Sequence, residues 1–161
     1  MNIKRLAGAA LAEALVLVMM PQSVVAAEKA SETTEVTAAV HKFFDNLGDE
    51  HLQTALAVCD SPVSIIDEFP PHEWNGPQAC ADWWKDFKAY NQKNGITEPN
   101  AALGTAWSVD VSGDRAYFVS PATYTYKQHG KSFAESHAVF TAALKRTQAG
   151  WRITGWTWSR H

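Results

Sequence analysis

The sequence predicts an α+β fold in which three N-terminal helices cover a curved, cone-shaped antiparallel sheet around one apolar pocket. Apolar residues recur at helical spacing as far as about residue 94 and alternate with a period of two from about residue 101 onward. The 161-residue chain is 46% hydrophobic and has a net charge of -3, which is typical of one globular domain. Its 7 Trp residues need a core, a pocket or a partner to cover them.

The first 27 residues are predicted to be a secretory signal peptide. Two basic residues precede an apolar run over 6–20, and small residues follow from Val25 to Ala27. We expect cleavage after Ala27 and a periplasmic or secreted protein without stable membrane insertion. Glu13 interrupts the run, so an uncleaved anchor is the alternative. The run is, however, shorter than the roughly 20 apolar residues of a stable membrane span.

The charge of the chain excludes several classes of partner. Removing residues 1–27 takes away 2 of 14 basic and 1 of 17 acidic side chains, which leaves 12 and 16 and a net charge of -4. Nucleic-acid binding needs a basic surface, and the densest basic cluster is only Lys145-Arg146. The glycines form no phosphate-binding loop, and the His and Cys spacings suit no metal. We therefore expect neither nucleic acid, cofactor nor metal.

Cys59 and Cys80 are the only cysteines. An even pair in an oxidising compartment can form a disulfide. Sequence spacing does not show whether the two Cα atoms come close enough. A disulfide and two buried free thiols therefore remain alternatives.

Three helices are expected after a loose polar leader over 28–33, in a folded domain that spans 34–161. The first presents Val36, Val40, Phe43 and Leu47 on one face and ends at Gly48. The second follows Asp49 and carries Leu52, Ala55, Leu56 and Cys59. The third follows Asn75-Gly76-Pro77 and is aromatic on one side, with Ala79, Trp83, Phe87 and Tyr90.

A short strand is expected over 62–67, before a loop that contains Pro70-Pro71. An antiparallel meander follows residue 101, with turns near 112–114, 128–130 and 148–150. Pro121 lies inside the strand over 115–127, so we expect a bulge or bend there.

The last strand predicts a second covered face of the sheet. Strict alternation puts Trp151 and Ile153 on one face, and Trp156 and Trp158 on the other. A half-solvated sheet does not tolerate large rings on both faces. We therefore expect the helices to cover one face and a second copy of the chain to cover the other.

Two segments carry a family resemblance, Val40 to Asp49 and Gly150-Trp151-Arg152-Ile153. Together with the order of elements, they make residues 34–159 resemble the nuclear transport factor 2-like superfamily, closest to its SnoaL-like and ketosteroid isomerase-like branches. The resemblance implies a cystatin-like α+β roll, a deep apolar cavity for a flat hydrophobic ligand, and a homodimer formed through the outer sheet face. It does not define an activity, because one fold hosts unrelated functions.

The resemblance to ketosteroid isomerases places Asp67 where that branch keeps its general base. Burial in an apolar pocket would raise the pKa of this carboxyl and prepare it for proton transfer. The hydrogen-bond donors that hold the enolate oxygen in the ketosteroid isomerases have no counterparts at the matching positions of this chain. Phe43 stands where the isomerases have a tyrosine, and Thr141 or Ala142 stands at their second acid. Ketosteroid isomerase activity is therefore not expected.

Replacement polar groups are expected on the strands of the meander. His137 can pair with Asp67 as a proton shuttle, and Tyr124 and Tyr126 lie on the preceding strand. Alternatively, His137 and Glu135 face solvent or form hydrogen bonds across strands.

The predicted pocket wall consists mainly of rings, with one histidine from the loop after the first strand. Rings at helical spacing are also typical of plain core, and loop exposure explains the histidine equally well. The predicted ligand-pocket residues are Phe43, Trp74, Trp83, Phe87, Trp107, Tyr124 and His72.

Three functions therefore fit the sequence. The first is an exported domain that binds a hydrophobic small molecule in its apolar pocket. The second is a proton-transfer enzyme, an isomerase, cyclase or dehydratase, with Asp67 as general base. The third is a non-catalytic homodimeric interaction module.

Overall fold

The computed structural model describes residues 22–160. Most of the predicted signal peptide, residues 1–21, therefore lies outside the described residues, while residues 22–27 begin the first helix. The prediction of a loose leader over 28–33 is wrong, because these residues continue the same helix. No helix within residues 22–160 is long and apolar enough to cross a membrane.

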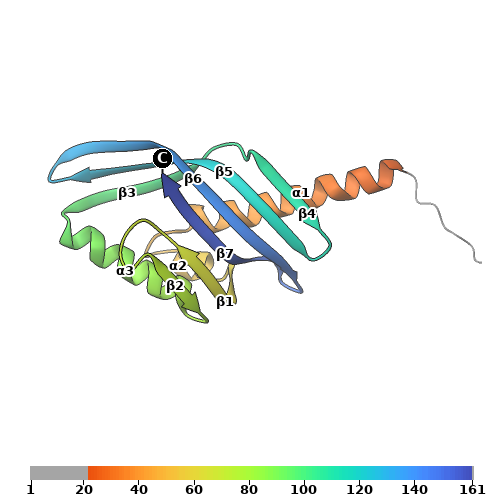
Figure 1. Cartoon of the computed structure of the whole chain (residues 1–161), viewed down its shortest axis with the longest axis horizontal. Helices are drawn as coiled ribbons and strands as arrows, with labels where there is room; N and C mark the ends of the chain where they lie inside the picture. The colour runs from red at the N-terminus through yellow and green to blue at the C-terminus, as the bar shows by residue number, and fades with distance from the viewer. Residues whose placement is uncertain (1–21, 161) are drawn as a thin grey trace, which may run out of the picture.

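The predicted α+β class is confirmed (Figure 1). A long and a short helix precede the first two strands, a third helix follows, and five strands complete the chain. In chain order the elements are α1 (Gln22–Asp45), α2 (Leu52–Leu56), β1 (Cys59–Ile66), β2 (Glu73–Gly76), α3 (Ala79–Lys93), β3 (Ile96–Leu103), β4 (Ser108–Ser112), β5 (Arg115–Gln128), β6 (Lys131–Thr147) and β7 (Gly150–Arg160).

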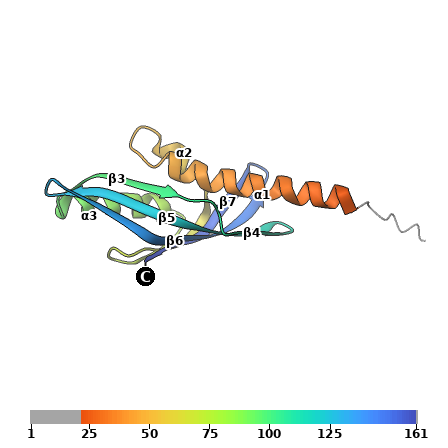
Figure 2. The same ribbon diagram turned by 90° about the horizontal axis from the view of Figure 1, so that it is seen from above.

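The strands form one curved, open seven-stranded sheet. Its order is β2-β1-β7-β6-β5-β3, and β4 also pairs with β5. The helix α1 packs on β4 and β7, and α3 packs on β1, β2 and β3. Figure 2 shows α1 lying along one side of the curved sheet. The sheet is antiparallel except that β1 runs parallel to β7.

Close contact between β1 and β7 requires a glycine. Ser64 is paired with Gly155, and a Cβ atom added at Gly155 would lie 3.2 Å from the Ser64 carbonyl oxygen. That distance is tighter than most Cβ contacts in proteins, so a larger residue would require the Ser64 backbone to shift by a few tenths of an ångström.

Two strands were not predicted. Residues 73–76, expected as loop and start of a helix, form β2 on the edge of β1. Residues 96–103, expected to precede the meander, form the edge strand β3, whose pairing with β5 shifts between Thr97 and Asn100. Both segments are mostly exposed, so neither has the apolar alternation that identifies a strand.

The helical hairpin also differs from the prediction. The helix α2 ends at Leu56, and Cys59 belongs to β1 instead of the apolar face of that helix. Backbone pairing of Cys59 with Ile153 of β7 extends the strand beyond the predicted segment.

The bulge predicted at Pro121 occurs close to that residue but not at it. Pro121 itself is in register with Val139, and the shift falls between Ala122 and Tyr124. The Pro121 carbonyl accepts a hydrogen bond from the Gly104 N–H at 2.8 Å, so its imide nitrogen faces the same edge. On that edge β5 changes its pairing partner from β4 to β3. No ladder hydrogen bond is required at this change, so the lack of an N–H in Pro121 does not interrupt the sheet.

The predicted two-faced arrangement of β7 is wrong. The pairing of β6 with β7 shifts between Ala143 and Leu144, so that Thr154 is an extra residue on β7. Ile153 then pairs with the buried Leu144 and Trp156 with the buried Ala142, which places both on the concave face. The Trp residues of β7 therefore give no argument for a second subunit, and the homodimer stays a prediction.

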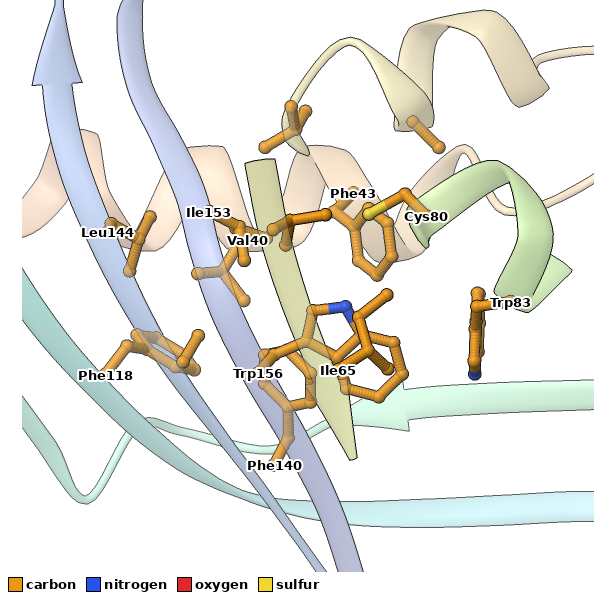
Figure 3. Packing of buried hydrophobic residues seen from close by; sticks show 14 of the residues in the cluster. Val40, Phe43, Ile65, Cys80, Trp83, Phe118, Phe140, Leu144, Ile153 and Trp156 are labelled. Carbon is orange, nitrogen blue, oxygen red and sulfur yellow. The ribbon is translucent and has the colours of Figure 1, made fainter. Parts of the chain in front are cut away.

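The core lies between this concave face and the helices (Figure 3). Val40 and Phe43 come from α1, Ile65 from β1, and Phe140 and Trp156 from the two central strands, and all are buried. Burying each such side chain contributes about 1.5 to 3 kcal/mol. This apolar packing holds α1 against the sheet.

Cys59 and Cys80 form a disulfide, with their Cα atoms 6.7 Å apart. It joins the start of β1 to the first turn of α3. Of the two alternatives left open by the sequence, a disulfide and two buried free thiols, the structure has the disulfide.

Reduction of this disulfide should lower the free energy of unfolding by about 3 kcal/mol, because the bond closes a loop of about 20 residues in the unfolded chain. Urea denaturation with and without dithiothreitol measures the change. The double variant C59A/C80A is the control and should not respond to the reductant. An equal response of both proteins would contradict the prediction.

Candidate functional site

A cavity of about 350 Å³ opens between α1, α3 and the concave face of the sheet. Rings from both helices, from β5 and β7 and from the loop after β1 make most of its wall. Of the predicted site residues, those that line it are Asp67, Phe43, Trp83, Phe87 and Tyr124.

Trp74 and Trp107 lie away from the cavity. Trp74 is buried, but its indole N–H donates to Asp86 Oδ2 at 2.9 Å and its ring packs on Phe69. Phe69 itself lines the cavity, so Trp74 stands behind the wall. Trp107 is 64% exposed, in the segment between β3 and β4. No helix or strand of the described part of the chain covers the Trp107 ring in this loop, and the spacing of apolar residues in the sequence does not reveal that.

His72 is exposed on the loop after β1 and does not line the cavity. Its Nδ1 donates to the backbone carbonyl of Asp67 at 3.2 Å. The residue has a positive φ of 75°, a left-handed conformation that is uncommon for residues other than glycine. His72 therefore supports the backbone of Asp67 from outside.

His137 is exposed and does not pair with Asp67, contrary to the proton-shuttle hypothesis. The reason is the register shift on β6, where Ser136 and His137 together face the single residue Thr123 of β5. Before this bulge Glu135 points inward, and after it Ala138 does. Strict alternation predicts that His137 and Glu135 lie on the same face of the sheet, but the bulge places them on different faces.

Asp67 follows β1 directly and lies largely buried at the cavity wall. Its Oδ2 accepts a hydrogen bond from the Trp83 indole N–H at 2.8 Å, and its Oδ1 accepts one from the Glu68 backbone N–H at 2.7 Å. These two donors fix the plane of the carboxylate. Burial raises the pKa of Asp67 from 3.8 to about 6, although both hydrogen bonds and nearby His72 and Arg160 oppose the rise.

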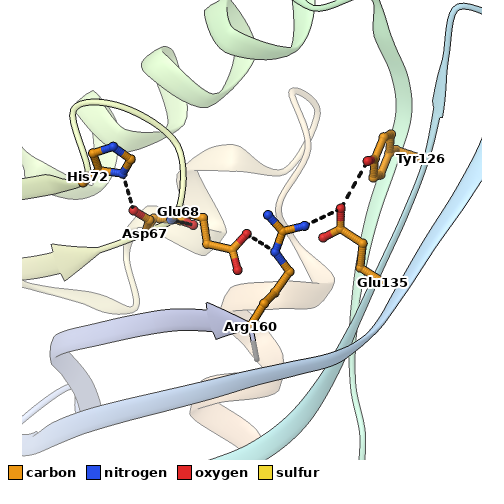
Figure 4. A network of polar contacts seen from close by, with 6 residues as sticks. All are labelled: Asp67, Glu68, His72, Tyr126, Glu135 and Arg160. Atoms are coloured by element: carbon orange, nitrogen blue, oxygen red, sulfur yellow. Dashed lines mark hydrogen bonds and ion pairs between the residues drawn. The ribbon is translucent and has the colours of Figure 1, made fainter.

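A polar network lies on the cavity wall (Figure 4). Arg160, at the end of β7, pairs with Glu68 and with Glu135, the latter at 2.7 Å. Tyr126 donates its hydroxyl to the same oxygen of Glu135 at 3.1 Å. Burial raises the pKa of Glu68, and Arg160 opposes this. The network ties together the ends of four strands of the sheet.

Sequence reasoning missed several residues of this site. Glu68 lies just after β1 and Arg160 at the end of β7, and the parallel pairing of these strands brings the two residues to one edge. Asn91 lies eight residues after Trp83 on the aromatic face of α3, and its position at helical spacing was the available signal. Within residues 22–160 no cluster of three or more His, Cys, Asp or Glu side chains could hold a metal ion.

The SnoaL-like domain family matches residues 27–160. The chain belongs to this family. Its structure is also similar to solved structures across most of its length. A nuclear transport factor 2-like protein with a cystatin-like fold from Novosphingobium aromaticivorans has a TM-score of 0.69 and 14% identity, and the match covers 89% of this chain and 91% of that one.

Two further similar structures are named for a reaction. A candidate dehydratase of the nuclear transport factor 2-like family from Streptomyces avermitilis has a TM-score of 0.66 and 15% identity, over 83% of this chain and 98% of that one. A candidate scytalone dehydratase from Novosphingobium aromaticivorans has a TM-score of 0.68 and 9% identity, over 84% and 88%. At these identities the likeness shows the fold alone. No curated protein matches the chain.

The variant D67N should become more stable relative to the wild type as pH rises from 4 to 7, by on the order of 2 kcal/mol. The folded protein holds the Asp67 proton up to about pH 6, whereas the unfolded chain releases it near 3.8. The wild type therefore loses stability across this window, and the neutral amide does not.

Urea denaturation of both proteins at pH 4, 5, 6 and 7 measures this difference. The amide also accepts one hydrogen bond fewer, but that loss is independent of pH and cancels in the comparison. D110N, on the exposed side of β4, is the surface control. A constant difference between D67N and wild type at all four pH values would show that burial does not raise the pKa of Asp67.

Proposed function

We propose that this SnoaL-like domain binds a hydrophobic small molecule in its cavity and moves a proton of that molecule with Asp67 as general base. The observation that carries the proposal is the Asp67 carboxylate, largely buried in an aromatic wall and oriented by Trp83 and Glu68. A pKa of about 6 leaves it ionised at neutral pH and yet a stronger base than an ordinary aspartate.

The chemistry that suits this site is removal of a proton from carbon beside a carbonyl group. One oxygen of Asp67 takes the proton as the C–H bond breaks, and the electron pair moves into the carbonyl to form an enolate. The proton is then returned to a different atom, or a leaving group departs. Isomerases, cyclases and dehydratases share this first step, and the likeness to candidate dehydratases supports the same class.

The aromatic wall supports the binding part of the proposal. Trp83 and Phe87 stack with centroids 5.6 Å apart and an interplanar angle of 17°, which gives one side of the cavity a flat surface. Phe43 adds a ring from α1 but has no hydrogen-bond donor. The tyrosine donor of ketosteroid isomerases is therefore absent from that position, and the ligand differs in how its oxygen is held.

Proton abstraction is testable with 2-tetralone, a neutral bicyclic ketone, by following deuterium uptake beside its carbonyl in D₂O with NMR. The wild type should accelerate exchange over buffer, and the rate should rise with pH to about 6 and then level off, as Asp67 loses its proton. D67N should reduce the enzyme-dependent rate by about 100-fold or more.

D110N serves as the matched carboxylate control and should keep the wild-type rate. Retention of that rate by D67N would contradict the role of Asp67. Far-ultraviolet circular dichroism of both variants establishes that each is folded.

We also propose that the protein is exported and that its leader is removed after Ala27. Residues 1–27 support this, because basic, apolar and small residues follow one another in the order of a signal peptide. The Cys59–Cys80 disulfide also supports it, because disulfides persist in oxidising compartments. Mass spectrometry of the protein from the periplasm or medium should find Glu28 as the first residue. A chain that retains residues 1–27 in a membrane fraction would instead support an uncleaved anchor.

A further inference from the structure

Two neighbouring polar side chains line the cavity, one from a helix and one from a strand. Asn91 lies near the end of α3 and is only 7% exposed. Tyr124 lies in the second half of β5. Both line the cavity.

Neither side chain satisfies its hydrogen-bonding capacity within the protein. Asn91 Oδ1 and the Tyr124 hydroxyl oxygen are both buried, and no hydrogen-bond partner for either occurs among the residues that the structure describes. Buried polar atoms are nearly always paired, so an unpaired buried pair beside a cavity indicates that something else binds there.

Tyr124 remains a neutral hydroxyl donor. Burial raises its pKa, and the negative charges of Glu135 and Asp67 raise it further, while the neighbouring Asn91 side chain opposes the rise. The phenol therefore keeps its proton at physiological pH. A Tyr hydroxyl can donate one hydrogen bond, and an amide oxygen can accept.

The Asn91 side of this pair lies away from Asp67 along α3. Trp83, Phe87 and Asn91 follow one another at intervals of four residues on one face of α3. Trp83 binds the Asp67 carboxylate, and Asn91 is eight residues further along the helix, an axial distance of about 12 Å. The Phe87 ring lies between them and approaches the Tyr124 ring, with centroids 6.4 Å apart.

The charge of the cavity disfavours an anionic ligand. Among the described residues the wall contains three carboxylates, Asp67, Glu68 and Glu135, and one basic side chain, Arg160. Arg160 is already paired with Glu68 and Glu135. A ligand carboxylate would find no free cation there and would face repulsion instead.

We propose that Tyr124 and Asn91 form a binding site for an uncharged hydroxyl group at the far end of a flat aromatic ligand. The Tyr124 hydroxyl donates to the ligand oxygen, and the ligand hydroxyl donates to Asn91 Oδ1. This site, the Tyr124–Asn91 anchor, rests on the proposed binding of a hydrophobic molecule in the cavity. It assigns the ligand to the neutral phenols and related hydroxylated ring compounds.

The test compares three two-ring probes by equilibrium dialysis: 2-naphthol, naphthalene and 2-naphthoate. An apolar cavity of about 150 Å³ holds benzene, so one of about 350 Å³ has room for a second ring. The wild type should bind 2-naphthol about tenfold more tightly than naphthalene, because two buried hydrogen bonds are gained. It should bind 2-naphthoate most weakly.

Y124F and N91L should each reduce the preference for 2-naphthol over naphthalene to about threefold or less, while leaving the affinity for naphthalene within about twofold. Y117F is the matched control, because Tyr117 lies on the same strand, is 49% exposed and does not line the cavity. It should keep the full preference.

Equal binding of 2-naphthol and naphthalene by the wild type would overturn the anchor, even if deuterium exchange still depended on Asp67. A preference that survives in both Y124F and N91L would overturn it as well. Tight binding of 2-naphthoate would overturn the inference of an uncharged ligand. Binding of none of the three probes would contradict both the anchor and the proposed function.

Discussion

The apolar lining of the concave face depends on two register shifts in the sheet. Side chains of a strand alternate between faces, so a long strand that always pairs in register keeps one parity inside. In β6 the inward residue changes from Glu135 to Ala138 across one bulge, and in β7 it changes from Ile153 to Trp156 across another. Each bulge also bends its strand, and the curvature creates the hollow that the helices cover.

The same shifts decide which polar groups reach that hollow. The bulge on β6 keeps Glu135 inside and turns His137 out. The bulge on β7 places Trp156, Trp158 and Arg160 on the cavity side. Arg160 can therefore join Glu68 of the loop after β1 to Glu135 of β6 at the cavity wall.

Asp67 shows how opposing effects determine the chemistry of one group. Two hydrogen bonds and two nearby cationic or polar partners favour its ionised form, whereas burial disfavours it, and burial has the larger effect. The disulfide contributes indirectly, because it joins the strand that ends at Asp67 to the first turn of α3, one turn before Trp83. The base and its donor are thus held by a covalent link between their elements.

Much of this molecule could be predicted from its residues. The change from helical to two-residue periodicity indicated an α+β fold, and the family resemblance placed Asp67 at the end of the first strand, beside the cavity where the structure has it. Phe43, Trp83, Phe87 and Tyr124 were likewise expected at the wall. The positions of the helix residues could be predicted because helical spacing is a local property of the chain.

Other features were decided by tertiary structure alone. The pairing of Glu68 with Arg160 joins residues 92 positions apart, through a parallel contact of β1 with β7 that has no local signal. The exposure of His137 and the inward turn of Trp156 follow from bulges, and a single inserted residue reverses every side chain after it. Sequence alternation records which residues share a face only while the register holds, and the register is set by the neighbouring strand.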